Sequence, residues 1–566
     1  MRAGFFFLFP LFWVVTAFAA APTLDQIYPA AMGVGTTNTV QMIGKFDPWP
    51  PKVWVDAPGL VFKAETNSGK FTVSAAPDAP VGPHLIRLYN KEGASEPRFL
   101  IVAKEPQLPE VEPNDEYSKA QSITNLPAHV NGRLDKSGDV DSYALQLEKN
   151  QTLIASIESF VLMAPVDAVL RIVDTNGLQV AFNHDDGRTL DPFLTWTAER
   201  AGTYIVQVFG FAYPAGSEVR FTGGNTCVYR LHLSRGPYVH HVLPLGLQRD
   251  KAATLQLFGW NLESESQRKL PYTPSSADKR FFTIGPPTVE NTLAIPLLNF
   301  PELRETEPNN TSNTAQQVEM PCAITGRIEK PGDIDVFQVH AKKGEPWRFQ
   351  VQSASLGFLL DAWLKVEDEQ GKELAKNDDA GGSDPLLEWA APTNGNYLLS
   401  IGNVVHRGGP DYLYHLICER AAPDWKATVA SSSFSVKPGS TNEIKVTLKR
   451  LNAFKKKIKF ELRGLPEGLK SEPVGLAEKA AEASLKLIAS DKAAPFAGPI
   501  RILGFPSEEA TNSKPVLNEF TVTSLNNGVP TGYNRLVVEN TDQIWLTVLP
   551  KPVEKPAAKP SAKPLP

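Results

Sequence analysis

The sequence predicts an all-β protein built from β-sandwich modules in series. Over most of the chain, apolar residues alternate with polar ones, and Gly, Asn, Asp or Pro separate these runs. This pattern is typical of strands joined by turns. Helical periodicity is weak, and 566 residues at roughly 100 to 200 per domain allow about three to five cores. We therefore expect several packed antiparallel sheets in succession.

The first twenty residues have the pattern of an export signal. In MRAGFFFLFPLFWVVTAFAA, Arg2 precedes an apolar run that ends in Ala17 and Ala19, an A-x-A arrangement. A signal anchor is the alternative, but the run is short and no later stretch approaches the roughly 18 apolar residues of a membrane span. We expect residues 1–20 to be a signal peptide of an exported protein, periplasmic, at the cell surface or secreted, without a transmembrane segment.

An internal duplication organises the middle of the chain. Two acidic blocks recur in the same order, EVEPND as ETEPNN and GDVDSY as GDIDVF, at positions 110–115, 305–310, 138–143 and 332–337. The repeated unit has roughly 120 residues, the size of a domain rather than of a solenoid repeat. We call residues 104–234 the first copy and residues 302–420 the second copy, and predict a β-sandwich for each.

In the flanking segments, apolar and polar residues also alternate, in runs separated by Pro and Gly. We expect an Ig-like first module at 22–103, a short Ig-like or irregular middle module at 235–301, and an Ig-like last module at 421–548. Residues 549–566 lack core-forming side chains and are expected to form a Pro/Lys/Ala-rich disordered tail.

Charge and cysteine content exclude some classes of function. The chain has 57 Lys and Arg against 62 Asp and Glu, a net charge of -5, and no basic block outside the tail, so nucleic acid is a poor partner. Cys227, Cys322 and Cys418 form no CxxC pair, which excludes a zinc or redox motif and a disulfide framework. Within the second copy, Cys322 and Cys418 are either buried free thiols or a single bridge.

The acidic blocks suggest a cation site. Alternate side chains of an extended stretch share a side, so Glu110 pairs with Glu112 and Asp139 with Asp141. If the fold joins the pairs, two charges about 5 Å apart repel by roughly 3 kcal/mol at an effective dielectric of about 20. No Lys or Arg lies within either acidic stretch, and calcium, which takes roughly six to eight oxygen ligands, suits such a site better than zinc. The alternative is a turn and linker with solvated surface carboxylates.

The same blocks carry a family resemblance. ExEPN, GDxDxF/Y about 25 residues later, a D-x-x-L-x-V-x-D-x-x-G strand pair, a D-P-L turn and G-x-Y resemble the bacterial pre-peptidase C-terminal (PPC) domain family, in two copies. The resemblance implies a jelly-roll-like sandwich, related to the collagen-binding module of clostridial collagenases, whose acidic linker and nearby Asp loop bind calcium. The implied ligands are Glu110, Glu112, Asn114, Asp139 and Asp141, and in the second copy Glu305, Glu307, Asn309, Asp333 and Asp335.

One difference between the copies affects these sites. Asp115, a further candidate ligand, is replaced by Asn310, and because ligand charge tunes calcium affinity we expect the second site to be weaker. The modules at 22–103 and 235–301 are similar to IPT/TIG-type Ig modules through a P-x-x-G and G-x-N-L pattern.

Catalytic motifs are not visible. The sequence has no HExxH, no GxSxG and no block that suits an α/β enzyme. The adjacent His240 and His241 are expected to point to opposite faces of a strand, which disfavours a shared metal. We expect no enzyme, although paired carboxylates for glycoside hydrolysis are not excluded.

Trp363 is a candidate ligand contact. In DAWLKVED it lies on the side of Lys365 and Glu367, and its counterpart in the first copy is Val169. An exposed Trp there would contact a polysaccharide or a protein strand, and the alternative is burial under a loop or a neighbouring module.

The sequence therefore predicts an exported, non-catalytic binding or scaffolding protein with two calcium-dependent domains, whose partner is an extracellular protein or polysaccharide. The alternative is an accessory or targeting component of a secreted peptidase system, or a cryptic hydrolase.

Overall fold

The computed structural model confirms the all-β fold class. It describes the residue ranges 20–185, 189–212, 220–262, 266–270, 273, 280–285, 289–379, 384–452, 454–506, 512–522 and 536–551. These residues form strands and two short 3-10 turns, without an α-helix. Within the same ranges, no helix has the length and apolar character needed to cross a membrane. Residues 1–19 of the predicted signal peptide and most of the predicted tail lie outside the described residues.

The first module contains two facing sheets. One sheet has the order β1 (Gln26–Tyr28), β3 (Thr37–Ile43), β6 (Lys70–Ala75), β5 (Leu60–Ala64). The other has the order β2 (Ala31–Gly33), β9 (Arg98–Ala103), β7 (Gly82–Asn90), β4 (Lys52–Val55), with β8 (Gly93–Ala94) beside β7. Between them, alternate apolar side chains such as Val40 and Leu88 are fully buried, as the alternating pattern predicts.

The two copies have identical strand order. In the first copy the sheets are β10 (Gln107–Pro109), β12 (Ala128–Arg133), β19 (Val228–Ser234), β14 (Thr152–Glu158), β17 (Phe193–Thr197), and β11 (Gln121–Ser122), β13 (Asp141–Leu147), β18 (Gly202–Ala212), β15 (Val166–Asp174), β16 (Gln179–Asn183). The second copy repeats them as β26 (Glu302–Arg304), β28 (Cys322–Arg327), β35 (Leu413–Arg420), β30 (Pro346–Gln352), β33 (Leu386–Ala390), and β27 (Gln316–Gln317), β29 (Ile334–Ala341), β34 (Gly395–Asn403), β31 (Ala362–Asp368), β32 (Glu373–Asn377). The 3-10 turns η1 (Tyr117–Lys119) and η2 (Ala354–Leu356) belong to one copy each. Each copy is thus a sandwich of two five-stranded sheets.

The middle module is smaller. Its two three-stranded sheets are β20 (Tyr238–Leu243), β22 (Ala253–Trp260), β23 (Gln267–Leu270), and β21 (Leu247–Gln248), β25 (Leu293–Leu298), β24 (Phe281–Ile284). The expectation that His240 and His241 point to opposite faces of a strand is wrong. The pairing of β20 with β22 shifts between Val239 and His241, and this bulge places Nδ1 of His240 3.0 Å from Nδ1 of His241.

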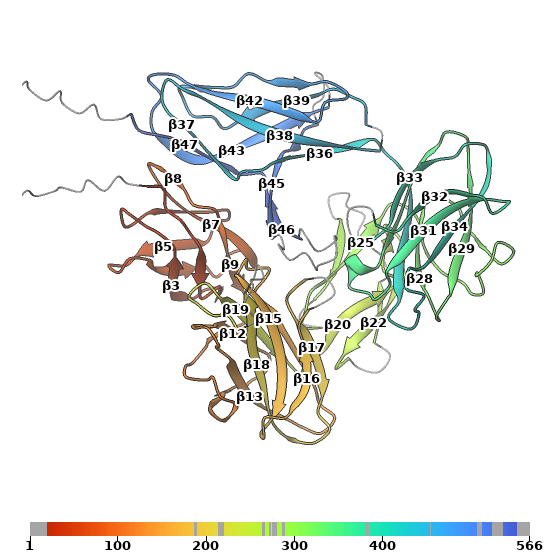
Figure 1. Ribbon diagram of the computed structural model, residues 1–566, viewed down its shortest axis with the longest axis horizontal. Coiled ribbons are helices and arrows are strands. Elements are labelled where there is room, and N and C mark those ends of the chain that lie inside the picture. The colour runs from red at the N-terminus through yellow and green to blue at the C-terminus, as the bar shows by residue number, and fades with distance from the viewer. Residues whose placement is uncertain are drawn as a thin grey trace, which may run out of the picture.

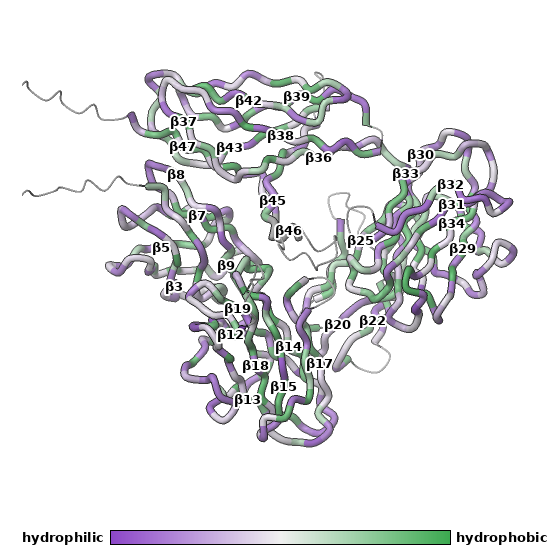
Figure 2. The backbone as a smooth tube through the Cα atoms, viewed as in Figure 1, coloured by the Kyte–Doolittle hydropathy of each residue, from purple (hydrophilic) through white to green (hydrophobic). Residues whose placement is uncertain are grey.

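The last module is a larger sandwich. Its sheets are β40 (Leu469–Lys470), β42 (Glu482–Ala489), β38 (Thr441–Leu451), β36 (Asp424–Val429), β45 (Leu517–Val522), β46 (Leu536–Thr541), and β37 (Ser433–Val436), β47 (Ile544–Val548), β43 (Phe496–Phe505), β39 (Ile458–Arg463), β41 (Val474–Leu476), with β44 (Lys514–Pro515) beside β43. Along these strands hydrophilic and hydrophobic residues alternate (Figure 2). Figure 1 shows β45 and β46 reaching from this module toward the centre of the molecule, where Phe520 meets Phe99 of the first module with ring centroids 6.3 Å apart.

The five modules close on themselves. In Figure 1 the last module lies beside the first, and the two copies complete the circuit. The buried Arg87 donates to Ser432 Oγ at 2.9 Å, and the ring of Trp545 lies 4.8 Å from that of Tyr89. At the next junction the backbone N–H of Ala31 donates to Asn131 of the first copy at 2.9 Å. A chain of modules in series has therefore become a closed arrangement rather than an extended string.

The three cysteines are buried thiols. Cys322 and Cys418 face each other as directly opposed residues of β28 and β35, and Cys227 lies alone in the first copy. Burial raises the pKa of the Cys418 thiol well above its usual value. Of the two sequence-based alternatives, the structure contains the free thiols.

Candidate metal centres

The acidic residues of each copy meet where its two sheets begin. In the first copy, Glu110 directly follows β10, which pairs in parallel with β12, and its backbone N–H donates to Asn131 at 3.1 Å. The loop after β12 then crosses to the other sheet, where Asp141 opens β13. Gly138 in this loop has φ +88°, a left-handed conformation that glycine adopts without strain. The topology therefore brings a linker and a loop that are distant in sequence to one end of the sandwich.

Several buried oxygens at the acidic end of the first copy have no hydrogen-bond partner. Asn114, Asp139 and Asp141 are fully buried, at 0% exposure. Each uses its other polar atom within the protein: Asn114 Nδ2 donates to Glu110 at 3.3 Å, Asp139 Oδ2 accepts the N–H of Asp135, and Asp141 Oδ2 accepts the Tyr229 hydroxyl at 2.6 Å. Their Oδ1 atoms, and that of Asp115, have no hydrogen-bond partner. Buried polar atoms are normally satisfied, so four such oxygens on one linker and one loop indicate a missing positive group.

The second copy repeats this geometry. Asn309 and Asp335 are at 0% exposure and Asp333 at 4%. Asn309 Nδ2 donates to Glu305 at 2.8 Å, and Asp335 Oδ2 accepts the Tyr414 hydroxyl at 2.7 Å. The Oδ1 atoms of Asn309, Asn310, Asp333 and Asp335 again lack a partner. Repetition of the same orphaned oxygens in both copies marks them as a built feature.

The carboxylates form compact groups rather than one cluster. Oxygens within 4.8 Å of one another come from three triplets, Glu110, Glu112 and Asp141, then Glu112, Asp115 and Asp139, and in the second copy Glu305, Glu307 and Asp335. Glu112 belongs to both groups of the first copy. Asp139 and Asp141, which were expected to act together, therefore face different groups. The donor set is entirely oxygen, which fits a hard cation such as calcium.

Burial disfavours the charged form of these carboxylates unless a positive group lies beside them. Burial, and then the charge of Glu110, raises the pKa of Asp141 far above its usual value, and burial also raises the pKa of Glu110. In the second copy, burial followed by the hydrogen bond and charge of Glu305 raises the pKa of Asp335 in the same way. A cation that favours the charged form would reverse these shifts.

Sequence reasoning overlooked one basic residue. Lys136, in the loop before Asp139, contacts Asp115 Oδ2 at 2.8 Å and Asp139 Oδ1 at 3.7 Å. The protein therefore neutralises part of the first site itself, with a residue that lies between the two acidic stretches in the sequence. The other triplet of that copy, which contains Asp141, has no such partner among the described residues.

Two tyrosines were also missed. Tyr229 and Tyr414 occupy equivalent positions on β19 and β35, and each donates to an aspartate near the start of a strand in the other sheet. Their rings lie over Gly132 and Gly326, where a Cβ would approach the ring atoms to 2.2 and 2.3 Å. Alignment of the two copies contains this signal, because Gly and Tyr recur at matching positions.

Trp363 lies on an outer face of the second copy and is only partly exposed. Its ring packs flat against Gly402, where a Cβ would come within 2.5 Å of the ring. The ammonium groups of Lys365 and Lys376 are 5.7 and 5.6 Å from the ring centroid. The Trp is thus partly exposed, with part of its ring covered by Gly402.

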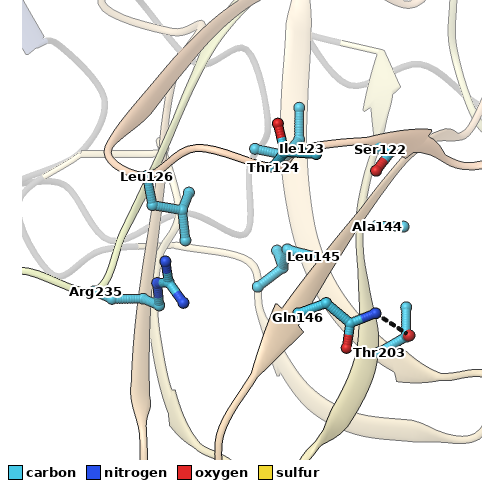
Figure 3. Close-up of a pocket in the computed structure, with 9 residues that line it drawn as sticks. All are labelled: Ser122, Ile123, Thr124, Leu126, Ala144, Leu145, Gln146, Thr203 and Arg235. Carbon is cyan, nitrogen blue, oxygen red and sulfur yellow. Dashed lines mark hydrogen bonds between the residues drawn. The ribbon is translucent and has the colours of Figure 1, made fainter.

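A small pocket lies at the other end of the first copy. Its volume is about 240 Å³, and it is lined by Ser122, Ile123, Thr124, Leu126, Ala144, Leu145, Gln146, Thr203 and Arg235. Figure 3 shows the side chains of Arg235, Leu126 and Leu145 converging, with Gln146 held by a hydrogen bond to Thr203, 2.7 Å long. Leu145 lies four residues beyond Asp141 on β13, about 13 Å at the usual rise of a strand, so this pocket is separate from the acidic site.

Comparison with known proteins gives partial matches. No family model matches the chain. A stretch of 100 residues, 17% of the chain, is 32% identical to a probable subtilase-type serine protease of Deinococcus radiodurans and spans 14% of that protein. Among solved structures, the pre-peptidase C-terminal domain of a Bacillus anthracis collagenase is 16% identical, over 19% of this chain and 94% of that one, with a TM-score of 0.16. Salmonella alpha-2-macroglobulin is 8% identical, over 89% of this chain and 48% of that one, with a TM-score of 0.13.

Proposed function

We propose that the protein is an exported, non-catalytic binding or scaffolding protein in which each copy binds calcium at its acidic end. The observation that supports this most directly is the set of orphaned, buried oxygens that recurs in both copies. Glu110, Glu112 and Asp141 would hold the ion in the first copy, where Asp115 and Asp139 form an adjoining group that shares Glu112. Glu305, Glu307 and Asp335 would hold the ion in the second copy. The ion supplies positive charge that the carboxylates lack.

The role proposed for calcium is mechanical. Glu110 lies where the first module passes the chain to the first copy, and its Oε2 accepts the N–H of Arg133 at 2.8 Å. The Arg133 guanidinium in turn lies 4.7 Å from the centroid of Tyr28 in the first module. Coordination would tie the acidic linker to the sandwich and thereby stiffen this junction.

Thermal unfolding of the full chain tests the calcium proposal. Calcium at about 100 times its dissociation constant should stabilise the folded state by roughly 2.7 kcal/mol, seen as a higher unfolding midpoint than in chelator. The triple substitution of Glu110, Glu112 and Asp141 by Ala should remove the first-copy part of this shift, and the matching variant at Glu305, Glu307 and Asp335 the second-copy part. Equal midpoints with calcium and with chelator would reject the proposal.

The two sites should differ in affinity. We expect Asp115→Asn to weaken the first site and Asn310→Asp to strengthen the second, each by up to about tenfold, because ligand charge tunes calcium affinity. Lys136→Ala should strengthen the first site, since Lys136 competes for Asp115. Calorimetric titration of the variants measures these changes, and unchanged affinities would show that position 115 does not contribute.

A peptidase-associated role is the second candidate. It is supported by the match of 100 residues to part of a probable serine protease. Under this proposal the chain is an accessory or targeting component, or a hydrolase of unrecognised type. A turnover assay over peptide and glycoside substrates separates these cases, because reproducible turnover lost with a single carboxylate substitution would contradict the non-catalytic proposal.

Trp363 is the proposed contact for an extracellular protein or polysaccharide. Its ring is flanked by Lys365 and Lys376, an arrangement that suits stacking against a sugar or an apolar side chain. Trp363→Ala should weaken retention on polysaccharide or protein matrices without lowering the unfolding midpoint greatly. Unchanged retention on every matrix that holds the native protein would reject this role.

A further inference from the structure

The pocket of Figure 3 is lined by the side chain of Arg235. Among the described residues, the Arg235 guanidinium makes no ion pair within 4.0 Å, and its hydrogen bond to Gln151 Oε1 is long, at 3.5 Å. Arg235 directly follows β19, so its side chain comes from one sheet while Leu145 comes from the other. The guanidinium therefore lies at the seam of the sandwich.

In the second copy, the arginine at the equivalent position has an acidic partner within the protein. Arg420 is the counterpart of Arg235, and Glu345 that of Gln151. Arg420 Nη2 contacts Glu345 Oε1 at 3.0 Å, and its guanidinium lies 4.8 Å from the centroid of Trp347. The first copy has Gln151 in place of this glutamate, so the charge of Arg235 is left available to a ligand.

The rest of the pocket restricts what the ligand is. Leu145 is buried and Ile123 nearly so, which gives an apolar floor, whereas Ser122, Thr124 and Gln146 at the rim are exposed. A volume of about 240 Å³ is below the roughly 300 to 1,000 Å³ usual for small-molecule sites. It accommodates one apolar side chain and a carboxylate, with the remainder of a longer molecule leaving through the polar rim.

We propose that this pocket binds the free carboxyl terminus of a peptide that ends in an apolar residue. Arg235 would pair with the terminal carboxylate, since a guanidinium matches a carboxylate in two parallel hydrogen bonds. The last side chain would lie against Leu126 and Leu145. This inference deepens the proposed binding function by naming a ligand class, and it rests on that function only in assuming a non-catalytic role.

Fluorescence polarisation with the full chain tests the proposal. The probe is a fluorescein-labelled peptide, Gly-Ser-Gly-Ser-Ala-Leu, with a free carboxyl terminus, and its control is the same peptide with a terminal amide. We expect saturable binding of the acid and at least tenfold weaker binding of the amide. Unlabelled N-acetyl-leucine should compete, and N-acetyl-leucinamide should not. Equal binding of acid and amide, or no binding of the acid up to 2 mM, would overturn the proposal.

Two substitutions in the first copy test whether Arg235 binds the peptide. Arg235→Gln should weaken binding at least tenfold. Gln151→Glu should do the same by restoring the internal pair of the second copy, and it should leave the unfolding midpoint equal or higher. The matched control Glu345→Gln alters the equivalent pair in the second copy and should leave peptide binding unchanged. Binding that survives both first-copy substitutions would assign the peptide to another site. Failure here leaves the calcium-dependent midpoint unaffected, so the two proposals fail separately.

Discussion

Replacing Asp191 with Ala is expected to destabilise the first copy by at least about 3 kcal/mol. The Asp191 carboxylate, 6% exposed, accepts the backbone N–H groups of Ser159, Phe160 and Val161 at 2.8, 2.7 and 3.1 Å. Each buried donor left unsatisfied costs roughly 1 to 3 kcal/mol. Chemical denaturation of the full chain, followed by a probe that reports the first copy, measures the loss.

A matched variant exists in the second copy. Asp384 accepts the N–H groups of Ser353, Ala354 and Ser355 at 3.0, 2.9 and 3.0 Å. Ser355 is exposed, so Asp384→Ala should cost less than Asp191→Ala because water replaces one of the lost bonds. A loss below about 1 kcal/mol for Asp191→Ala would show that the loop relaxes to satisfy its donors elsewhere.

Replacing Arg87 with Ala is expected to separate the first module from the last. Arg87 is 2% exposed and donates to Ser95 O at 2.6 Å and Ser432 Oγ at 2.9 Å. Burial lowers the pKa of its guanidinium to about 10, which indicates how completely it is removed from water. Only the bond to Ser432 crosses to the last module, and a hydrogen bond to a charged group contributes about 1.5 to 3 kcal/mol. Its loss should weaken the docking enough for the modules to separate.

Small-angle scattering measures this opening as a larger maximum dimension. The control is Lys91→Ala, which removes a charge from the same module at a side chain 64% exposed and should leave the scattering unchanged. If Arg87→Ala gives the native scattering curve, the rings of Trp54, Tyr89 and Trp545 suffice to hold the modules together.

Local pattern predicted the fold class and much of the candidate site. Strand alternation indicated sandwiches, and duplication of the acidic blocks identified residues that lie together at the end of each copy. Alternate side chains of an extended stretch share a side, which explains why oxygens of Glu110 and Glu112 lie within 4.8 Å of each other. This rule failed for Asp139 and Asp141, because Asp139 lies in the loop before the strand and Asp141 within it.

Other features depend on contacts between distant segments. Tyr229 approaches Asp141 from a strand 88 residues away, and no local rule gives that distance. The His240 and His241 rings meet because of a bulge, which sequence periodicity does not reveal. Docking of the last module on the first requires Arg87 to find Ser432 across 345 positions, so a string of modules was the natural expectation.

The closed arrangement determines how the molecule would carry tension. In Figure 1 the first and last modules, which carry the two ends of the described chain, lie side by side. A pull between these ends would pass through the end modules to the contact between Arg87 and Ser432 and to the Trp545 ring. The acidic junctions would feel no force until that contact had yielded, after which the chain could extend module by module. The contact between the end modules would therefore break first, and the two copies would bear the load only after it had broken.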